Sequence, residues 1–213
     1  MDALTLVIGN KAYSSWSLRP WLALRHIGVP FTEVVAPLGQ PDSRANILRH
    51  SPSGRVPLLK HGERTVWDSL AICEYLAETY PEARLWPEEA YARAVARSVS
   101  AEMHSGFADL RTSMFMDLKR KRPGEGRSEA CLADIARVTE IWRDARARFG
   151  TGGPYLFGRF SVADCMYAPV ATRFETYGVE LDPVCRAYAD ALLALPALRE
   201  WSEAARAEPW TLY

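Results

Sequence analysis

The chain has 213 residues, enough for one large domain or two small ones, and 48% of them are hydrophobic, which is ample for a buried core. Basic and acidic residues number 26 each, so net charge gives no reason to expect nucleic acid or an anionic membrane as a partner. No apolar run approaches the roughly 18–20 residues of a membrane span, and four scattered cysteines favour buried free thiols in a reducing cytoplasm over disulfides or a metal site.

The first 80 residues alternate between strand and helix signals. Strands are expected at 4–9, 31–36, 56–60 and 65–66, and helices at 17–25, 42–50 and 68–80. Ser17 is expected to cap the first helix, with Pro20 near its first turn and Gly28 at its end. The resulting order, β-α-β-α-β-β-α, predicts a small sheet covered by helices.

The segment 81–87 carries two prolines and interrupts this pattern, which predicts a linker between a domain at 1–80 and a second domain at 88–213. The second part is helical in composition throughout. Ser161 and Asp164 have the spacing of a capping box before an apolar helix, for which we expect a structural role at the centre of this domain. The basic run 119–123 lacks interleaved aromatic residues, so it is interpreted as a solvated helix end rather than a nucleic-acid patch.

Two short features in the first part point to a ligand. Pro57 interrupts an apolar run that otherwise reads as a strand, and a cis Val56-Pro57 bond would leave the backbone groups of Val56 free to pair with an extended peptide. Asp68 and Ser69 stand directly before a helix, where free N–H groups and the positive end of the helix dipole favour an anion. Together they predict a small peptide acid as the ligand.

These features, in this order, resemble the soluble glutathione S-transferases over the whole chain. Ser14-Ser15-Trp16-Ser17-Leu18-Arg19 is most similar to the zeta class, the maleylacetoacetate isomerase type, which carries a Ser-Ser-x-Ser-x-Arg motif there. The resemblance implies a thioredoxin-like α/β domain with a mixed four-stranded sheet, followed by an all-α helical bundle. It further implies glutathione as co-substrate, no metal, and a homodimer.

The resemblance also implies a role for each ligand-site residue. The backbone of Val56 next to Pro57 would pair with the cysteinyl part of glutathione, while Asp68 and Ser69 would hold its γ-glutamyl end. Arg55 would reach the glycyl carboxylate, although a solvated turn arginine is an equal alternative. His50 is a similarly placed alternative.

A serine hydroxyl is the expected thiol activator. By the resemblance, Ser14 or else Ser15 would donate a hydrogen bond to the glutathione sulfur, with Tyr13 as a second choice. A free thiol has a pKa of about 8.5 and only the thiolate attacks, so a hydroxyl donor beside a helix start would favour the reactive form. The electrophile is expected to be small and hydrophobic.

By the resemblance, the acceptor pocket would be lined from both halves, by Trp16, Met103, His104, Phe107 and Arg111. The alternative for each is ordinary helix packing. Trp16 replaces the cysteine common in the zeta motif and is expected to wall the pocket, while Trp210 and Tyr213 would cover it or pack on the helices.

Two other functions remain open. The zeta-class isomerases carry an arginine in the helix after the capping box, and the candidate here, Arg173, falls about one turn early. A transferase that conjugates glutathione is therefore the main prediction, and a glutathione-dependent cis-trans isomerase of the maleylacetoacetate type is the alternative. A non-catalytic protein of the same fold, acting in interaction or regulation, is the alternative from another class.

Overall fold

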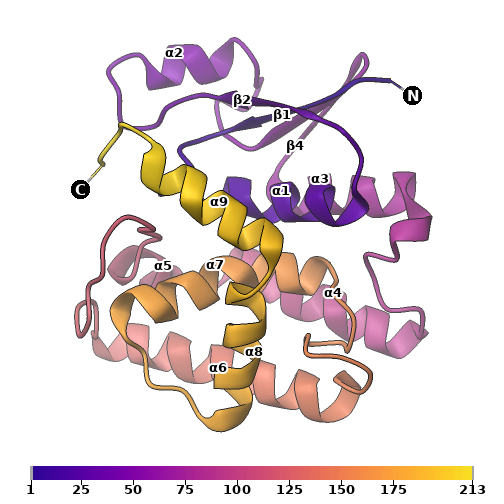
Figure 1. Ribbon diagram of the computed structural model, residues 1–213, viewed down its shortest axis with the longest axis vertical. Coiled ribbons are helices and arrows are strands. Elements are labelled where there is room, and N and C mark those ends of the chain that lie inside the picture. Colours follow the sequence, from indigo (N-terminus) through magenta and orange to yellow (C-terminus); the bar gives the residue numbers. More distant parts are fainter. Residues whose placement is uncertain (1, 213) are drawn as a thin grey trace.

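The computed structural model describes residues 2–212, and the first part is a sheet with helices on both faces (Figure 1). Its elements follow the predicted order: β1 (Leu4–Ile8), α1 (Ser15–Ile27), β2 (Thr32–Val35), α2 (Ser43–Leu48), β3 (Leu58–His61), β4 (Arg64–Trp67) and α3 (Ser69–Thr79). The strands lie in the order β2-β1-β3-β4, with β1 parallel to β2 and antiparallel to β3, and β3 antiparallel to β4. The predicted mixed four-stranded sheet is confirmed.

The alternation of side chains along β1 and β3 separates two apolar layers. Leu6 pairs in register with Leu59, and both belong to the main core with α1 and α3. Val7 pairs with Leu58, and both pack on the opposite face against Ile47 of α2. The sheet is therefore covered on both faces.

Helix α1 begins earlier than predicted. Its N-cap is Ser14 rather than Ser17, because the N–H of Ser17 donates to Ser14 Oγ over 3.4 Å. Pro20 consequently lies inside the helix rather than in its first turn, which corrects the prediction. Gly28 ends the helix as predicted, with a φ of 80° that favours glycine. The earlier start places the serine motif on the first turn of α1.

The second part is helical, as predicted. After the 3₁₀ helix Pro81–Ala83 it contains α4 (Ala90–Ser105), α5 (Ala108–Ser113), α6 (Glu129–Phe149), α7 (Val162–Tyr177), α8 (Pro183–Leu193) and α9 (Pro196–Ala207). The division into 1–80, 81–87 and 88–213 stays a prediction.

Helix α7 runs through the centre of this helical part. All its residues except Glu175 are buried, and α7 packs against α1, α4 and α8. Both hydrogen bonds of the predicted capping box between Ser161 and Asp164 are present. The Asp164 carboxylate also accepts hydrogen bonds from the N–H of Leu156 and the hydroxyl of Tyr188. The α1–α7 contact joins the sheet part to the helical part.

The basic run 119–123 lies in a loop between α5 and α6, so its prediction as a helix end was wrong. The chain is held there by the buried Asp117 carboxylate, which pairs with Arg120 and Arg122.

All four cysteines are buried free thiols, as predicted. Across residues 2–212, no helix is long and apolar enough to cross a membrane, and no group of His, Cys, Asp and Glu side chains is arranged to hold a metal ion.

Candidate functional site

A cavity of about 880 Å³ opens where the sheet part meets α4. Its wall brings together residues predicted for glutathione, for its thiol and for the acceptor: Tyr13, Ser14, Trp16, Arg55, Val56, Pro57, Asp68, Ser69 and His104. A cavity of this size matches those that hold small molecules in other proteins.

One side of the cavity is formed by the chain that enters β3. The Val56-Pro57 peptide bond is cis, as predicted. Val56 is half-buried on the wall, Pro57 is buried behind it and Arg55 is exposed at the rim. The exposed Arg55 guanidinium is free to approach a ligand carboxylate from solvent.

The N-terminus of α3 forms the next part of the wall. Asp68 has a φ of 76°, unusual for a residue other than glycine, and its Oδ1 accepts from the N–H groups of Leu70 at 2.9 Å and Ala71 at 3.1 Å. Ser69 is buried, and its Oγ accepts from Arg19 Nη1 at 3.4 Å. The first turn of α3 is thus held in place while its positive end faces the cavity.

His104 of α4 closes the cavity from the helical part. Its Nε2 lies 3.1 Å from Oδ2 of Asp68, the oxygen that does not cap α3. Its ring meets that of Trp16 edge to face at 5.3 Å. Burial lowers the pKa of His104, and the Asp68 carboxylate opposes this effect. Asp68 therefore connects the two parts of the chain.

The serine motif presents one hydroxyl to the cavity. Ser17 Oγ accepts from the N–H of Gly9 at 3.1 Å and lies 2.7 Å from Ser14 Oγ. Ser14 Oγ also accepts from the N–H of Ser17. When Ser17 donates its hydroxyl proton to Ser14, the proton of Ser14 remains for a group in the cavity. Ser14 lies on the wall, as does Tyr13, whereas Ser15 is buried outside it.

Three arginines surround Trp16 and Ser15, a cluster that sequence reasoning did not assemble. The Cζ of Arg19 lies 4.2 Å from the ring centroid of Trp16, and that of Arg111 lies 5.2 Å away. Arg19 is fully buried, and its Nε and Nη2 have no hydrogen-bond partner among residues 2–212. Burial, with added repulsion from Arg173 and Arg111, lowers the pKa of Arg19 to about 9. Arg19 contacts Ser69 and Trp16, which lie on the cavity wall, so a positive charge lies directly behind this wall at neutral pH.

Arg173 reaches the serine motif from α7. Its Nη2 donates to Ser15 Oγ at 3.1 Å, while Nε and Nη1 donate to the carbonyl oxygens of Met114 and Pro169. Burial, and then Arg111, lower the pKa of Arg173 to about 10. The one-turn offset noted in the sequence does not keep Arg173 away from the serine motif.

Other predicted residues lie elsewhere. Met103 and Phe107 are buried in the helical core, and Arg111 is half-buried with Nη1 donating to the carbonyl of His104 at 3.0 Å. His50 is not on the wall. Trp210 is half-buried beyond α9, and Tyr213 lies outside the described residues.

Trp67 was missed by sequence reasoning, although it lies on the cavity wall with 49% of its surface exposed. The available signal was its position next to Asp68 at the end of a short strand. An exposed indole at the mouth of a cavity offers a flat surface for a ligand.

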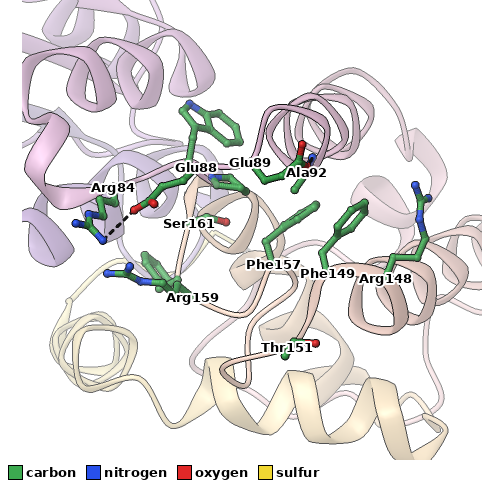
Figure 2. A pocket seen from close by; sticks show the side chains of 13 residues that line it. Arg84, Glu88, Glu89, Ala92, Arg148, Phe149, Thr151, Phe157, Arg159 and Ser161 are labelled. Carbon is green, nitrogen blue, oxygen red and sulfur yellow. Dashed lines mark hydrogen bonds and ion pairs between the residues drawn. The ribbon is translucent and has the colours of Figure 1, made fainter.

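A second cavity of about 440 Å³ lies between the linker, the start of α4 and the end of α6 (Figure 2). Phe149 and Phe157 stack side by side on its wall, with centroids 5.4 Å apart. Arg84 is paired with Glu88 at 2.8 Å, and Arg148 is likewise paired with a neighbouring carboxylate. None of the residues predicted for glutathione lies on this wall, so the larger cavity is the candidate site.

Comparison with known proteins agrees with this geometry. The chain matches a family model described as the glutathione S-transferase N-terminal domain over residues 13–79, and one described as the C-terminal domain over residues 88–204. Maleylacetoacetate isomerase from Rattus norvegicus is 30% identical over 177 residues, covering 81% of this chain and 79% of the relative. Maleylpyruvate isomerase from a Ralstonia species is 27% identical over 207 residues, covering 92% and 98%. A solved glutathione transferase homologue from Burkholderia, with bound glutathione, has a TM-score of 0.72 at 25% identity, covering 97% of this chain and all of that one.

Proposed function

Since this chain belongs to the glutathione S-transferase family, we propose that it binds glutathione in the larger cavity and uses the Ser14 hydroxyl to hold the thiolate for attack on a small hydrophobic electrophile. The observation that carries the proposal is the position of Ser14. It lies on the cavity wall, accepts a hydrogen bond from the N–H of Ser17, and lies 2.7 Å from Ser17 Oγ, so that a proton donated by the Ser17 hydroxyl leaves the proton of Ser14 for the sulfur.

Glutathione would lie along the wall from β3 to α3. The backbone of Val56 would pair with the cysteinyl unit, as in strand addition, and Arg55 would meet the glycyl carboxylate. Ser69, through its hydroxyl and its own N–H at the positive end of α3, would take the γ-glutamyl carboxylate, and Asp68 its ammonium group.

The site favours the thiolate by three effects that add. Ser14 donates a hydrogen bond, the N-terminus of α1 supplies a partial positive charge, and the buried guanidinium groups of Arg19 and Arg173 add full positive charges. Each unit by which the thiol pKa falls corresponds to about 1.4 kcal/mol. Holding sulfur and electrophile together supplies the rest of the rate acceleration.

A glutathione-dependent cis-trans isomerase is the second candidate, and the hydrogen bond between Arg173 and Ser15 favours it. The thiolate would add to one carbon of a cis double bond, and the resulting single bond would rotate. Expulsion of the same thiolate would then restore the double bond in trans. Arg173 and Arg111 lie beside Ser15 and Trp16, and their positive charges would favour a substrate that bears a carboxylate. Relatives named for this chemistry support it.

We also propose a homodimer in the cytoplasm, a proposal that rests on the family rather than on the single chain described here. Light scattering tests the dimer. A non-catalytic role is opposed by the joint presence of Ser14, Val56 and the Asp68-Ser69 pair at one cavity. Failure of the protein to bind a glutathione column would favour the non-catalytic role.

The decisive experiment measures conjugation of a halo-aromatic electrophile and isomerisation of maleylacetone by the wild type, Ser14→Ala and Ser15→Ala. For a thiol-activating hydroxyl, Ser14→Ala should lower kcat/KM by about 100-fold, and the ultraviolet absorbance of bound thiolate should titrate at higher pH. Ser15→Ala should have a smaller effect on conjugation. Full activity in both variants would exclude the serine mechanism and direct attention to Tyr13.

A further inference from the structure

The backbone of Lys11 and Ala12, which lie just before Tyr13 and Ser14 in the turn 10–14 (the thiol-activating loop), is hydrogen-bonded to the segment after α9 and to the helical part. The N–H of Lys11 donates to Glu208 Oε1 at 2.8 Å, and the N–H of Ala12 donates to Glu208 Oε2 at 3.2 Å. One carboxylate thus binds two successive backbone amides that are 196 and 197 positions away in the sequence.

The carbonyl groups of the same two residues are also bonded to the helical part. The indole Nε1 of Trp201 donates to the Lys11 carbonyl at 2.8 Å, and the N–H of Leu118 donates to the Ala12 carbonyl at 3.2 Å. All four backbone polar groups of this dipeptide therefore bind α9, the segment after it, or the loop before α6. In Figure 1, α9 runs from the helical part to the side of the sheet part, where these contacts form.

Glu208 is itself fixed. It follows directly after α9, and the Lys119 ammonium group donates to its carbonyl and, at 2.9 Å, to the carbonyl of Trp210. The segment that bears the carboxylate is therefore fixed on one side by α9 and on the other by Lys119.

The position of Lys11 and Ala12 determines where Ser14 lies. The turn that contains them is short: the N–H groups of Tyr13 and Ser14 both donate to the carbonyl of Asn10, at 3.1 Å and 2.8 Å. Lys11 and Ala12 form the middle of this turn, so a shift of their backbone moves the Ser14 hydroxyl relative to Val56 and Asp68, which are positioned by other elements.

We propose that Glu208 is a positioning residue for the thiol-activating loop, its carboxylate holding the Lys11 and Ala12 amides so that the Ser14 hydroxyl faces the glutathione sulfur. The inference rests on the proposed function of Ser14. A carboxylate suits this task because it offers two acceptor oxygens to two donors, whereas an amide offers one oxygen and an NH₂ group that opposes the second donor.

The test compares Glu208→Gln and Glu208→Ala with the wild type. We expect kcat/KM for conjugation to fall by about tenfold in the Gln variant and by about 100-fold in the Ala variant. Glutathione affinity should change by less than about threefold, because the residues proposed to bind its backbone and carboxylates are untouched. Lys119→Met, which frees the segment that presents Glu208, should reproduce part of the loss.

Two readouts separate positioning from other causes. Through its charge alone, the loss of a nearby carboxylate would lower the pKa of the bound thiol, whereas displacement of Ser14 would raise that pKa. A higher thiol pKa in the Glu208 variants therefore supports the proposal, and a lower one overturns it. Amide hydrogen exchange at Lys11 and Ala12 should accelerate in Glu208→Ala. Faster exchange with unchanged kcat/KM and thiol pKa would overturn the proposal.

Glu203→Gln is the matched control, since Glu203 is an exposed residue of α9 and should leave every readout unchanged. Ser14→Ala separates a failure of the proposed serine mechanism from a failure of the positioning role of Glu208. If Ser14→Ala retains full activity, the serine mechanism fails while the exchange experiment still reports whether Glu208 holds the loop. If Ser14→Ala is impaired and Glu208→Ala is fully active, only the positioning role is lost.

Discussion

Arg173 of α7 donates a hydrogen bond from Nη2 to Ser15 Oγ over 3.1 Å, joining residues 158 positions apart. The contact lies where α7 packs on α1, the interface that joins the two parts of the chain. The buried guanidinium of Arg173 therefore lies beside the serine motif. This placement makes Arg173 the residue whose replacement best separates conjugation from isomerisation.

We expect Arg173→Met to lower kcat/KM for a substrate that bears a carboxylate, such as maleylacetone, at least about tenfold more than for a neutral halo-aromatic. The reason is that the buried Arg173 guanidinium places a full positive charge beside the serine motif, which favours binding of a substrate carboxylate and has little effect on a neutral substrate. Parallel assays of the two substrates measure the ratio. Arg143→Met, which removes a surface arginine paired with Asp182, is the control. Equal losses for both substrates would contradict a carboxylate-binding role.

Ser17→Ala is expected to raise the pKa of bound glutathione by about 0.5–1 unit, because Ser17 bridges the N–H of Gly9 and the hydroxyl of Ser14 and thereby orients the proton of Ser14. Absorbance titration of the bound thiolate measures the shift. Ser100→Ala is the matched control, since the Ser100 hydroxyl is buried and has no hydrogen-bond partner among residues 2–212. An unchanged thiol pKa in Ser17→Ala would show that Ser14 needs no such orientation.

Asp68→Asn should raise the Kd for glutathione by about tenfold or more while changing the free energy of unfolding by less than about 1 kcal/mol. Asparagine keeps the oxygen that caps α3 and tolerates the positive φ, but it lacks the charge that would hold an ammonium group. Calorimetry and urea unfolding give the two quantities.

The control for this change is Asp182→Asn. Asp182 caps α8 with one oxygen and pairs with Arg143 through the other, the same arrangement far from the cavity. It should leave glutathione binding unchanged. A similar Kd for Asp68→Asn and the wild type would remove Asp68 from the proposed ligand set.

Trp16→Ala is expected to raise KM for an aromatic electrophile by about tenfold while leaving KM for glutathione within about threefold. The indole forms part of the wall and contacts the guanidinium groups of Arg19 and Arg111, and each contact contributes about 0.5–2 kcal/mol. Trp86→Ala removes an indole from the second cavity and should spare both KM values. An unchanged KM for the aromatic electrophile in Trp16→Ala would show that the electrophile does not bind against Trp16.

The sequence revealed those parts of the site that depend on local chemistry. Pro57 in an apolar run indicated the cis bond, and Asp68 with Ser69 before a periodic segment indicated the helix start, because each signal involves neighbouring residues. The element order followed from the same kind of local pattern.

The remaining features depend on packing between distant segments. Ser14 and Ser17 both fit a helix cap, and only the hydrogen bonds among Ser14, Ser17 and Gly9 decide between them. The burial of Arg19, whose Nε and Nη2 have no hydrogen-bond partner among residues 2–212, and the contact of Glu208 with Lys11 have no counterpart in sequence spacing. Such contacts arise from the way α7 and α9 pack on the sheet part, which periodicity does not specify.

Asp164→Asn should reveal how the buried capping box responds to pH. Burial raises the pKa of Asp164 to about 6, against the opposing effect of hydrogen bonds from Leu156, Ser161 and Tyr188. A carboxyl group whose pKa is higher in the folded than in the unfolded chain contributes stability that is present at low pH and is lost as the pH rises through about 6. The advantage of the wild type over Asp164→Asn in free energy of unfolding should therefore shrink by about 2 kcal/mol between about pH 4 and pH 7.5. Urea unfolding at several pH values measures this difference. Tyr188→Phe removes one hydrogen bond to the carboxylate and should move the change to higher pH, whereas an advantage that grows with pH would show that the hydrogen bonds outweigh burial.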